Sequence, residues 1–180
     1  MELKCNRCID YPNGMLYNRG KNTEGTNAMS IVTFYRGDPN APKTTRPTHL
    51  GSNVIITWQG KILLERRRDS DTWGLIGGGV KKREQPIDAI AREVWEELGL
   101  RIPKERFVKR KVYDEPARIA AYQDGSVWKM VIVLYTLELE QESNITISAE
   151  SREVRFFTKE ELKDIEIVIT HSDLVEQWFV

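Results

Sequence analysis

One stretch of the sequence, Pro86–Leu98, has the pattern of an amphipathic helix that must pack against a larger apolar layer. A proline stands in its first turn and Gly99 follows its last residue, as is common at the two ends of helices. Apolar residues recur at spacings of three and four, which places them in one stripe of a helix: Ile87, Ile90, Ala91, Val94 and Leu98. The sequence therefore predicts a helix over 86–98 with one face in a core.

Three glutamates crowd one flank of this helix within a single turn: Glu93, Glu96 and Glu97. Like charges at spacings of three and four cost about 0.2–0.5 kcal/mol per pair. Arg92 is a partner that the helix itself offers, although in the less favourable order along the chain. A hard divalent cation, which takes several converging oxygen ligands, would relieve this repulsion. A solvated acidic face is the alternative interpretation.

The residues around the helix favour the cation. Five residues separate Gly78 from Glu84, and seven separate Glu84 from Arg92. The run that follows, 92–100, is Arg-Glu-Val-Trp-Glu-Glu-Leu-Gly-Leu. This pattern resembles the signature of the Nudix hydrolase superfamily, which is matched here without exception from Gly78 to Leu100. Two flanking segments, Leu63–Arg67 and Glu150–Phe157, are also similar to Nudix domains.

The resemblance implies the α/β (α+β) class, with a Nudix-type α/β/α sandwich in which a mixed β-sheet lies between helices. Apolar and alternating runs predict strands at Ser30–Arg36, Asn53–Trp58, Lys61–Glu65, Phe107–Tyr113, Ser126–Leu139 and Glu153–Phe157. Two short helices are predicted near 159–163 and 172–179. We expect residues 1–48 to form a loop-rich N-terminal extension that could add a strand to the sheet, dock onto a second subunit or cap the substrate cleft. Residues 49–180 are expected to form the Nudix hydrolase domain.

The resemblance also implies an activity, the metal-dependent hydrolysis of a nucleoside diphosphate linked to another moiety X. Mg²⁺ or Mn²⁺ would neutralise the phosphate oxygens, orient water and lower the pKa of that water. By resemblance Glu93 and Glu97 are metal ligands, Glu96 shares the metal or orients its water, and the carbonyl of Gly77 is a further ligand. Glu93 and Glu96 are thereby catalytic. A nucleotide-sensing domain without catalysis is the alternative, although its usual mark, loss of signature glutamates, is absent from the sequence.

Other residues receive supporting roles. By resemblance Arg92 holds the carboxylates in place, and Glu84 binds an additional metal ion or braces the loop. Gly78 and its two neighbouring glycines are expected to form a tight turn that approaches the ligand closely. The general base is either a signature glutamate or Glu150, with Glu153 as the competitor. In many Nudix proteins a proline precedes the glycines after the tryptophan that corresponds to Trp73, and here Ile replaces it.

Substrate contacts are less determined by the sequence. Basic residues beside the signature, at 66–68 (Arg67 among them) and 81–83, could contact phosphates or could be solvated loop charge. Trp95 lies away from the apolar stripe, so we expect it to pack on a neighbouring segment or a second subunit, and a homodimer stays open. Aromatic residues that could stack a base or belong to the core are Trp58, Trp73, Tyr113, Tyr122 and Trp128.

Composition excludes several classes of protein. The chain has 180 residues with 27 basic and 27 acidic side chains, so it has no net charge to attract a nucleic-acid polymer, and we expect a small diphosphate as partner. No apolar run approaches the ~20 residues of a membrane-spanning helix, no signal segment is evident, and a cytoplasmic protein is expected. Cys5 and Cys8 make half of a zinc-ribbon pattern, which His49 and His171 could complete if distant segments converge.

Overall fold

The computed structural model describes residues 15–18, 31–67, 72–140, 144–149 and 151–179. The strands in this part of the chain are β1 (Met15–Asn18), β2 (Ile31–Arg36), β3 (His49–Trp58), β4 (Lys61–Arg67), β5 (Trp73–Gly74), β6 (Ile76–Gly79), β7 (Val108–Tyr122), β8 (Val127–Glu138) and β9 (Ser151–Phe157). The helices are α1 (Pro86–Leu98), α2 (Ile169–Glu176) and the 3₁₀ turns η1 (Lys104–Arg106), η2 (Glu161–Asp164) and η3 (Gln177–Phe179). None of the described helices combines the length and apolar character needed to cross a membrane.

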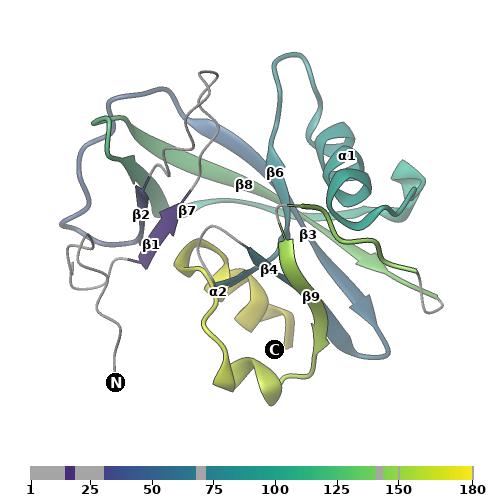
Figure 1. Ribbon diagram of the computed structural model, residues 1–180. Coiled ribbons are helices and arrows are strands. Elements are labelled where there is room, and N and C mark those ends of the chain that lie inside the picture. Colours follow the sequence, from purple (N-terminus) through teal and green to yellow (C-terminus); the bar gives the residue numbers. More distant parts are fainter. Residues whose placement is uncertain (1–14, 19–30, 68–71, 141–143, 150, 180) are drawn as a thin grey trace.

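All nine described strands belong to one mixed sheet (Figure 1). Along the sheet the order is β1-β2-β7-β8-β3-β4-β5, while β6 pairs with β3 and β9 pairs with β4. Strand β3 runs parallel to β8 and antiparallel to β4 and β6. Gln59 and Gly60 have φ values of 49° and 73°, as the two central residues of a tight hairpin require, and they join β3 to β4.

The two faces of the sheet carry separate hydrophobic cores. On β3, Val54 and Ile56 pack in the cluster that contains α1, whereas Ile55 between them packs in the cluster that contains α2. Because successive side chains of a strand point to opposite faces, the two helices cover opposite sides of the sheet (Figure 1). The predicted α/β/α sandwich with a mixed sheet is therefore confirmed.

The observed bounds of helices and strands agree best with the predicted bounds where the apolar pattern of the sequence is strongest. Helix α1 has the predicted bounds, and it ends at Gly99 with a left-handed φ of 70°. The strand predicted to stop at Tyr113 instead continues to Tyr122. Its second half contains charged residues and a proline that hide the alternation, and pairing with β2 and β8 supplies the hydrogen bonds. The glycines predicted to form a tight turn lie in β6, and the last helix begins at Ile169 rather than at residue 172.

A buried ion pair fastens α2 to the sheet. Arg118 on β7 is fully buried, and its Nη2 donates to Oδ2 of Asp173 on α2 at 2.5 Å. Its Nε and Nη1 donate to the carbonyls of Thr170 and Pro116 at 3.2 and 3.0 Å. Arg36 on β2 places its Nη1 3.6 Å from the same Asp173 oxygen. Three elements, β2, β7 and α2, therefore meet at one buried carboxylate.

Replacing Arg118 by Met should destabilise the protein by about 3–5 kcal/mol, because it removes the main partner of a buried charge. The Arg118→Met, Asp173→Asn double variant should recover part of this loss, since no buried carboxylate is left uncompensated. Urea unfolding of the variants measures both effects. Lys109→Met, at an exposed position of the same strand, is the control and should change the free energy of unfolding by less than about 0.5 kcal/mol. A loss below about 1 kcal/mol in Arg118→Met would contradict the assigned role.

Candidate functional site

Helix α1 brings its acidic flank against the backbone of β6. The N–H of Gly77 donates to Oε2 of Glu97 at 3.2 Å. A Cβ added to Gly78 would lie 2.5 Å from Oε1 of Glu93, and one added to Gly77, whose φ is 144°, would lie 2.2 Å from the carbonyl oxygen of Ser52. Side chains are thus excluded at both glycines, and this lets the carboxylates approach the main chain closely.

Arg92 is the hub of the acidic cluster. Its Nε and Nη2 donate to the two carboxylate oxygens of Glu84 at 2.9 and 3.1 Å. Its Nη1 donates to Glu93 at 2.6 Å and to Glu96 at 3.0 Å, while Nη2 also reaches the carbonyl of Gly79 at 3.2 Å. The guanidinium therefore orients three carboxylates relative to one another and ties them to β6.

These contacts change the proton affinities of the partners. The hydrogen bond from Arg92, above all, lowers the pKa of Glu84 from 4.5 to about 2, with help from the N–H of Lys81. Conversely, the hydrogen bond to Glu84, followed by contacts with Glu93 and Glu96, raises the pKa of Arg92 further above its usual range. Glu84 and Arg92 are therefore both charged at neutral pH.

The donor chemistry of the cluster fits a hard divalent cation. Arg92 donates to three of the four carboxylates, and the fourth, on Glu97, accepts from a backbone N–H, so four carboxylates gather beside β6. Among the described residues, no three His, Cys, Asp or Glu side chains are arranged to enclose a metal ion. Carboxylate oxygens beside main-chain groups are the ligands that Mg²⁺ and Mn²⁺ prefer.

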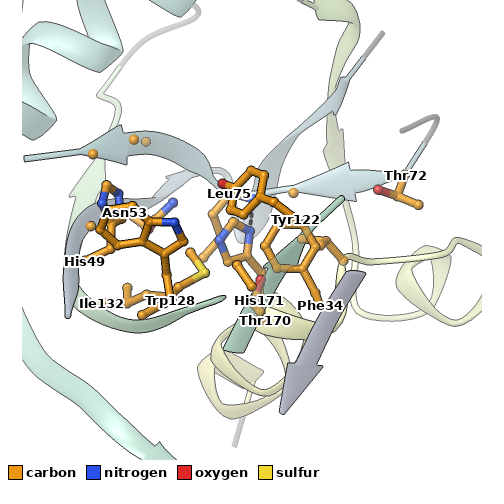
Figure 2. A pocket seen from close by; sticks show the side chains of 18 of the residues that line it. Phe34, His49, Asn53, Thr72, Leu75, Tyr122, Trp128, Ile132, Thr170 and His171 are labelled. Atoms are coloured by element: carbon orange, nitrogen blue, oxygen red, sulfur yellow. Dashed lines mark hydrogen bonds between the residues drawn. The ribbon is translucent and has the colours of Figure 1, made fainter. Parts of the chain in front are cut away.

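A cavity of about 590 Å³ adjoins the glycines of β6 (Figure 2). Its walls come from β2, β3, β5, β6, β7, β8 and α2, and both histidines of the sequence line it. His49 and Trp128 pack edge to face with ring centroids 6.1 Å apart. A Cβ on Gly79 would lie 3.0 Å from the His49 ring, so this aromatic pair lies directly beside β6.

The second histidine joins α2 to the segment that leads into β6. Nδ1 of His171 accepts the N–H of Leu75 at 3.2 Å, and a Cβ on Gly74 would lie 3.2 Å from that nitrogen. A ring nitrogen that accepts a hydrogen bond carries no proton, so in the neutral ring the proton is on Nε2. Phe34 and Tyr122, which pack in one cluster, form another part of the cavity wall.

Comparison with known proteins identifies the family. The model of the NUDIX domain matches residues 47–178, which is most of the chain. The chain belongs to the NUDIX domain family. The acidic part of α1 and the glycines of β6 thus occupy the signature segment of a NUDIX domain, as the resemblance of the sequence predicted.

Two curated relatives and one solved structure illustrate the likeness. A MutT-like protein of Streptomyces ambofaciens is 43% identical over 73 residues, 39% of this chain and 47% of the relative. An RNA pyrophosphohydrolase of a Psychrobacter species is 40% identical over 47 residues, 26% of this chain and 27% of the relative. The chain therefore spans less than half the length of these relatives. The NUDIX domain of Shewanella oneidensis NrtR, solved with ADP ribose, shares the fold with a TM-score of 0.58 at 20% identity, covering 78% of this chain and 90% of that one.

The NUDIX domain brings most of the predicted site residues together. One group gathers around Arg92, and a second joins the α1 carboxylates to β6: Glu84, Glu93 and Glu96 in the first, Gly77, Gly78 and Glu97 in the second. Trp73 lines the cavity and also packs edge to face on Phe157, with centroids 4.6 Å apart. The backbone of Arg67 belongs to β4, opposite Ser151. Glu150 lies outside the described residues, as do Cys5 and Cys8 of the zinc hypothesis.

The aromatic residues proposed to stack a base divide between cavity and core. Tyr122 and Trp128 line the cavity of the NUDIX domain, whereas Tyr113 is buried and Trp58 packs on Phe156. Trp95 is 48% exposed, and the guanidinium of Arg101 lies 5.3 Å from its ring centroid. Lining residues that the sequence did not indicate include Phe34, Asn53, Ser126 and Thr170. The two histidines of the sequence, His49 and His171, were the one hint of this cavity in the sequence, since both of them line it.

Replacing Arg92 by Ala should flatten the acid dependence of stability. Because the folded pKa of Glu84 is about 2 and its ordinary value is 4.5, the group stabilises the fold above pH 4.5, and this contribution is lost as the pH falls towards 2. Without Arg92 the pKa of Glu84 returns towards 4.5 and the loss becomes smaller. Urea unfolding across this pH range, with EDTA present, measures the slope. Arg101→Ala, at an exposed position beyond α1, should keep the original slope, and an unchanged slope in Arg92→Ala would contradict the coupling.

Proposed function

We propose that this NUDIX domain hydrolyses the diphosphate bond of a nucleoside diphosphate linked to another moiety X, with Mg²⁺ or Mn²⁺ bound at the carboxylates of α1. The observation that carries the proposal is the position of β6. Its glycines contact Glu93 and Glu97 and also line the cavity. A phosphate group above β6 would therefore lie between a cation held by the helix and a substrate group held by the cavity.

The residues divide the work as follows. Glu93 and Glu97 hold the cation, with Glu96 beside them, and the ion supplies charge neutralisation and a lowered pKa for attacking water. Arg92 holds the carboxylates of Glu84, Glu93 and Glu96 in fixed positions relative to one another through its hydrogen bonds to them. Attack of water on phosphorus breaks one P–O bond of the diphosphate, and a carboxylate oxygen takes the proton of the water. Glu96 and Glu150 are the two proposed acceptors of that proton.

The range of X is tested with a substrate panel. NDP-sugars, dinucleotides, ADP-ribose and nucleoside triphosphates belong to it, and a 5′-triphosphorylated RNA oligonucleotide is added because a relative is an RNA pyrophosphohydrolase. The panel is assayed with Mg²⁺, with Mn²⁺ and with EDTA. Metal-dependent release of a phosphorylated product supports the proposal. Tight binding of a panel member without hydrolysis of any would instead indicate a sensing domain.

Glu97→Gln should reduce kcat by at least about 100-fold on whichever panel substrate is turned over, because it removes an ion ligand that also braces β6. Calorimetric titration with Mn²⁺ should show weaker metal binding in the same variant. Thermal unfolding gives an independent measure, since a hundredfold excess of metal over its dissociation constant stabilises the native protein by about 2.7 kcal/mol. Glu105→Gln, exposed in η1, is the matched control. If Glu97→Gln kept both metal affinity and turnover, the assignment of the metal site would be wrong.

Glu150→Gln should lower kcat by about 10²–10⁴ if Glu150 accepts the proton of the attacking water. Glu153→Gln, on the exposed part of β9, is the matched comparison, because it makes the same chemical change three residues along the chain. A pH–rate profile of both variants distinguishes loss of a base from loss of structure. A decrease of less than about threefold in Glu150→Gln would leave Glu96 as the proposed base, unless Glu153→Gln shows the large decrease, which would assign the role to Glu153.

A further inference from the structure

Strand β2 lies before the part of the chain that the family model matches, which begins at residue 47. It is nevertheless built into the sheet, because Val32, Phe34 and Arg36 lie opposite Tyr122, Ala120 and Arg118 in an antiparallel ladder with β7. The Phe34 side chain is 7% exposed and lines the cavity, where Figure 2 shows it near the end formed by Tyr122 and Thr170. The wall of the cavity thus depends on a residue that precedes the family domain.

Two contacts fix β2 against the rest of the cavity. The N–H of Gly37 donates to the carbonyl of Ala117 at 2.8 Å, which continues the ladder beyond the strand. Arg36 lies 3.6 Å from Asp173, the residue of α2 that also pairs with buried Arg118. Because α2 carries Thr170 and His171 into the same wall, Phe34 holds a defined position relative to them.

The lining of the cavity is aromatic and nearly uncharged. The described residues that form it include neither lysine nor arginine, and Asp124 is their one acidic side chain. Oδ1 of Asp124 already accepts from the backbone N–H and the hydroxyl of Ser126, at 2.8 and 2.5 Å. The described lining therefore offers phosphate no lysine or arginine, and in the proposed function the phosphates lie at β6 beside the cation. A volume of about 590 Å³ lies in the usual range for small-molecule sites.

We propose that Phe34 is a specificity-determining residue of this NUDIX domain, and that it recognises a flat, uncharged aromatic ring, the nucleobase of the substrate, inside the cavity. The proposal rests on the proposed function only in taking the cavity as the substrate's binding site. Rings of Phe34, Tyr122 and Trp128 supply apolar surface for such a group, and side-chain amide and hydroxyl groups such as those of Asn53 and Thr170 supply its hydrogen bonds.

Binding, measured apart from hydrolysis, tests this inference. Titration calorimetry with Mg²⁺ present compares AMP, GMP, CMP and UMP with ribose 5-phosphate, which differs from them by lacking the base. The native protein should bind at least one nucleotide about tenfold more tightly than ribose 5-phosphate. Phe34→Ala should weaken binding of that nucleotide about tenfold and leave the affinity for ribose 5-phosphate unchanged.

Two further variants keep the test decisive. Val32→Ala removes buried apolar volume from the same strand and cluster but not from the cavity wall, so its nucleotide affinity should equal that of the native protein. Phe34→Leu keeps most of the apolar bulk and should show a smaller loss in the same direction, which protects the test if Phe34→Ala does not fold.

Three results would overturn the inference. These are equal affinity of the native protein for ribose 5-phosphate and all four nucleotides, no binding of any nucleotide, and unchanged nucleotide affinity in a folded Phe34 variant. Failure of the proposed function looks different, because it would appear as absent hydrolysis with base-dependent binding intact.

Discussion

Mutual repulsion among the carboxylates of α1 is the constraint around which this site is organised. Of the four acidic side chains at the site, three accept hydrogen bonds from a single guanidinium, that of Arg92. The fourth, on Glu97, contacts β6, where three successive glycines leave the main chain open to a close approach. The apolar stripe of α1 makes this arrangement tolerable, because its burial in the core holds the helix in place regardless of the charges on its other flank.

Strand β6 divides the molecule into two chemical environments that meet over a few residues. One side is acidic and suited to a hard cation. The other is an aromatic cavity whose described lining lacks basic side chains. A substrate with a charged diphosphate and an uncharged ring matches both environments at once, whereas an inorganic polyphosphate matches only one. In the proposed function, the acidic side therefore positions the phosphates, and the cavity selects for what is attached to them.

The sequence predicted what is encoded locally and missed what depends on distant pairing. The bounds of α1 and the acidic cluster follow from short-range patterns, and the structure has them. The second half of β7 could not be predicted, because its charged residues break the alternation and its partners are far away in the sequence. The cavity was hidden for the same reason, since its walls come from seven elements between residues 34 and 171.

The meeting of Arg36, Arg118 and Asp173 has a practical consequence for anyone who works with a shortened form of this protein. A fragment cut to the limits of family likeness, residues 47–178, would retain every signature glutamate and yet lose β2. It would also lose one of the two arginines at Asp173, along with one wall of the cavity. Homology boundaries would thus preserve the cation-binding machinery while altering the compartment beside it, so ligand preferences measured on such a fragment would belong to the fragment alone.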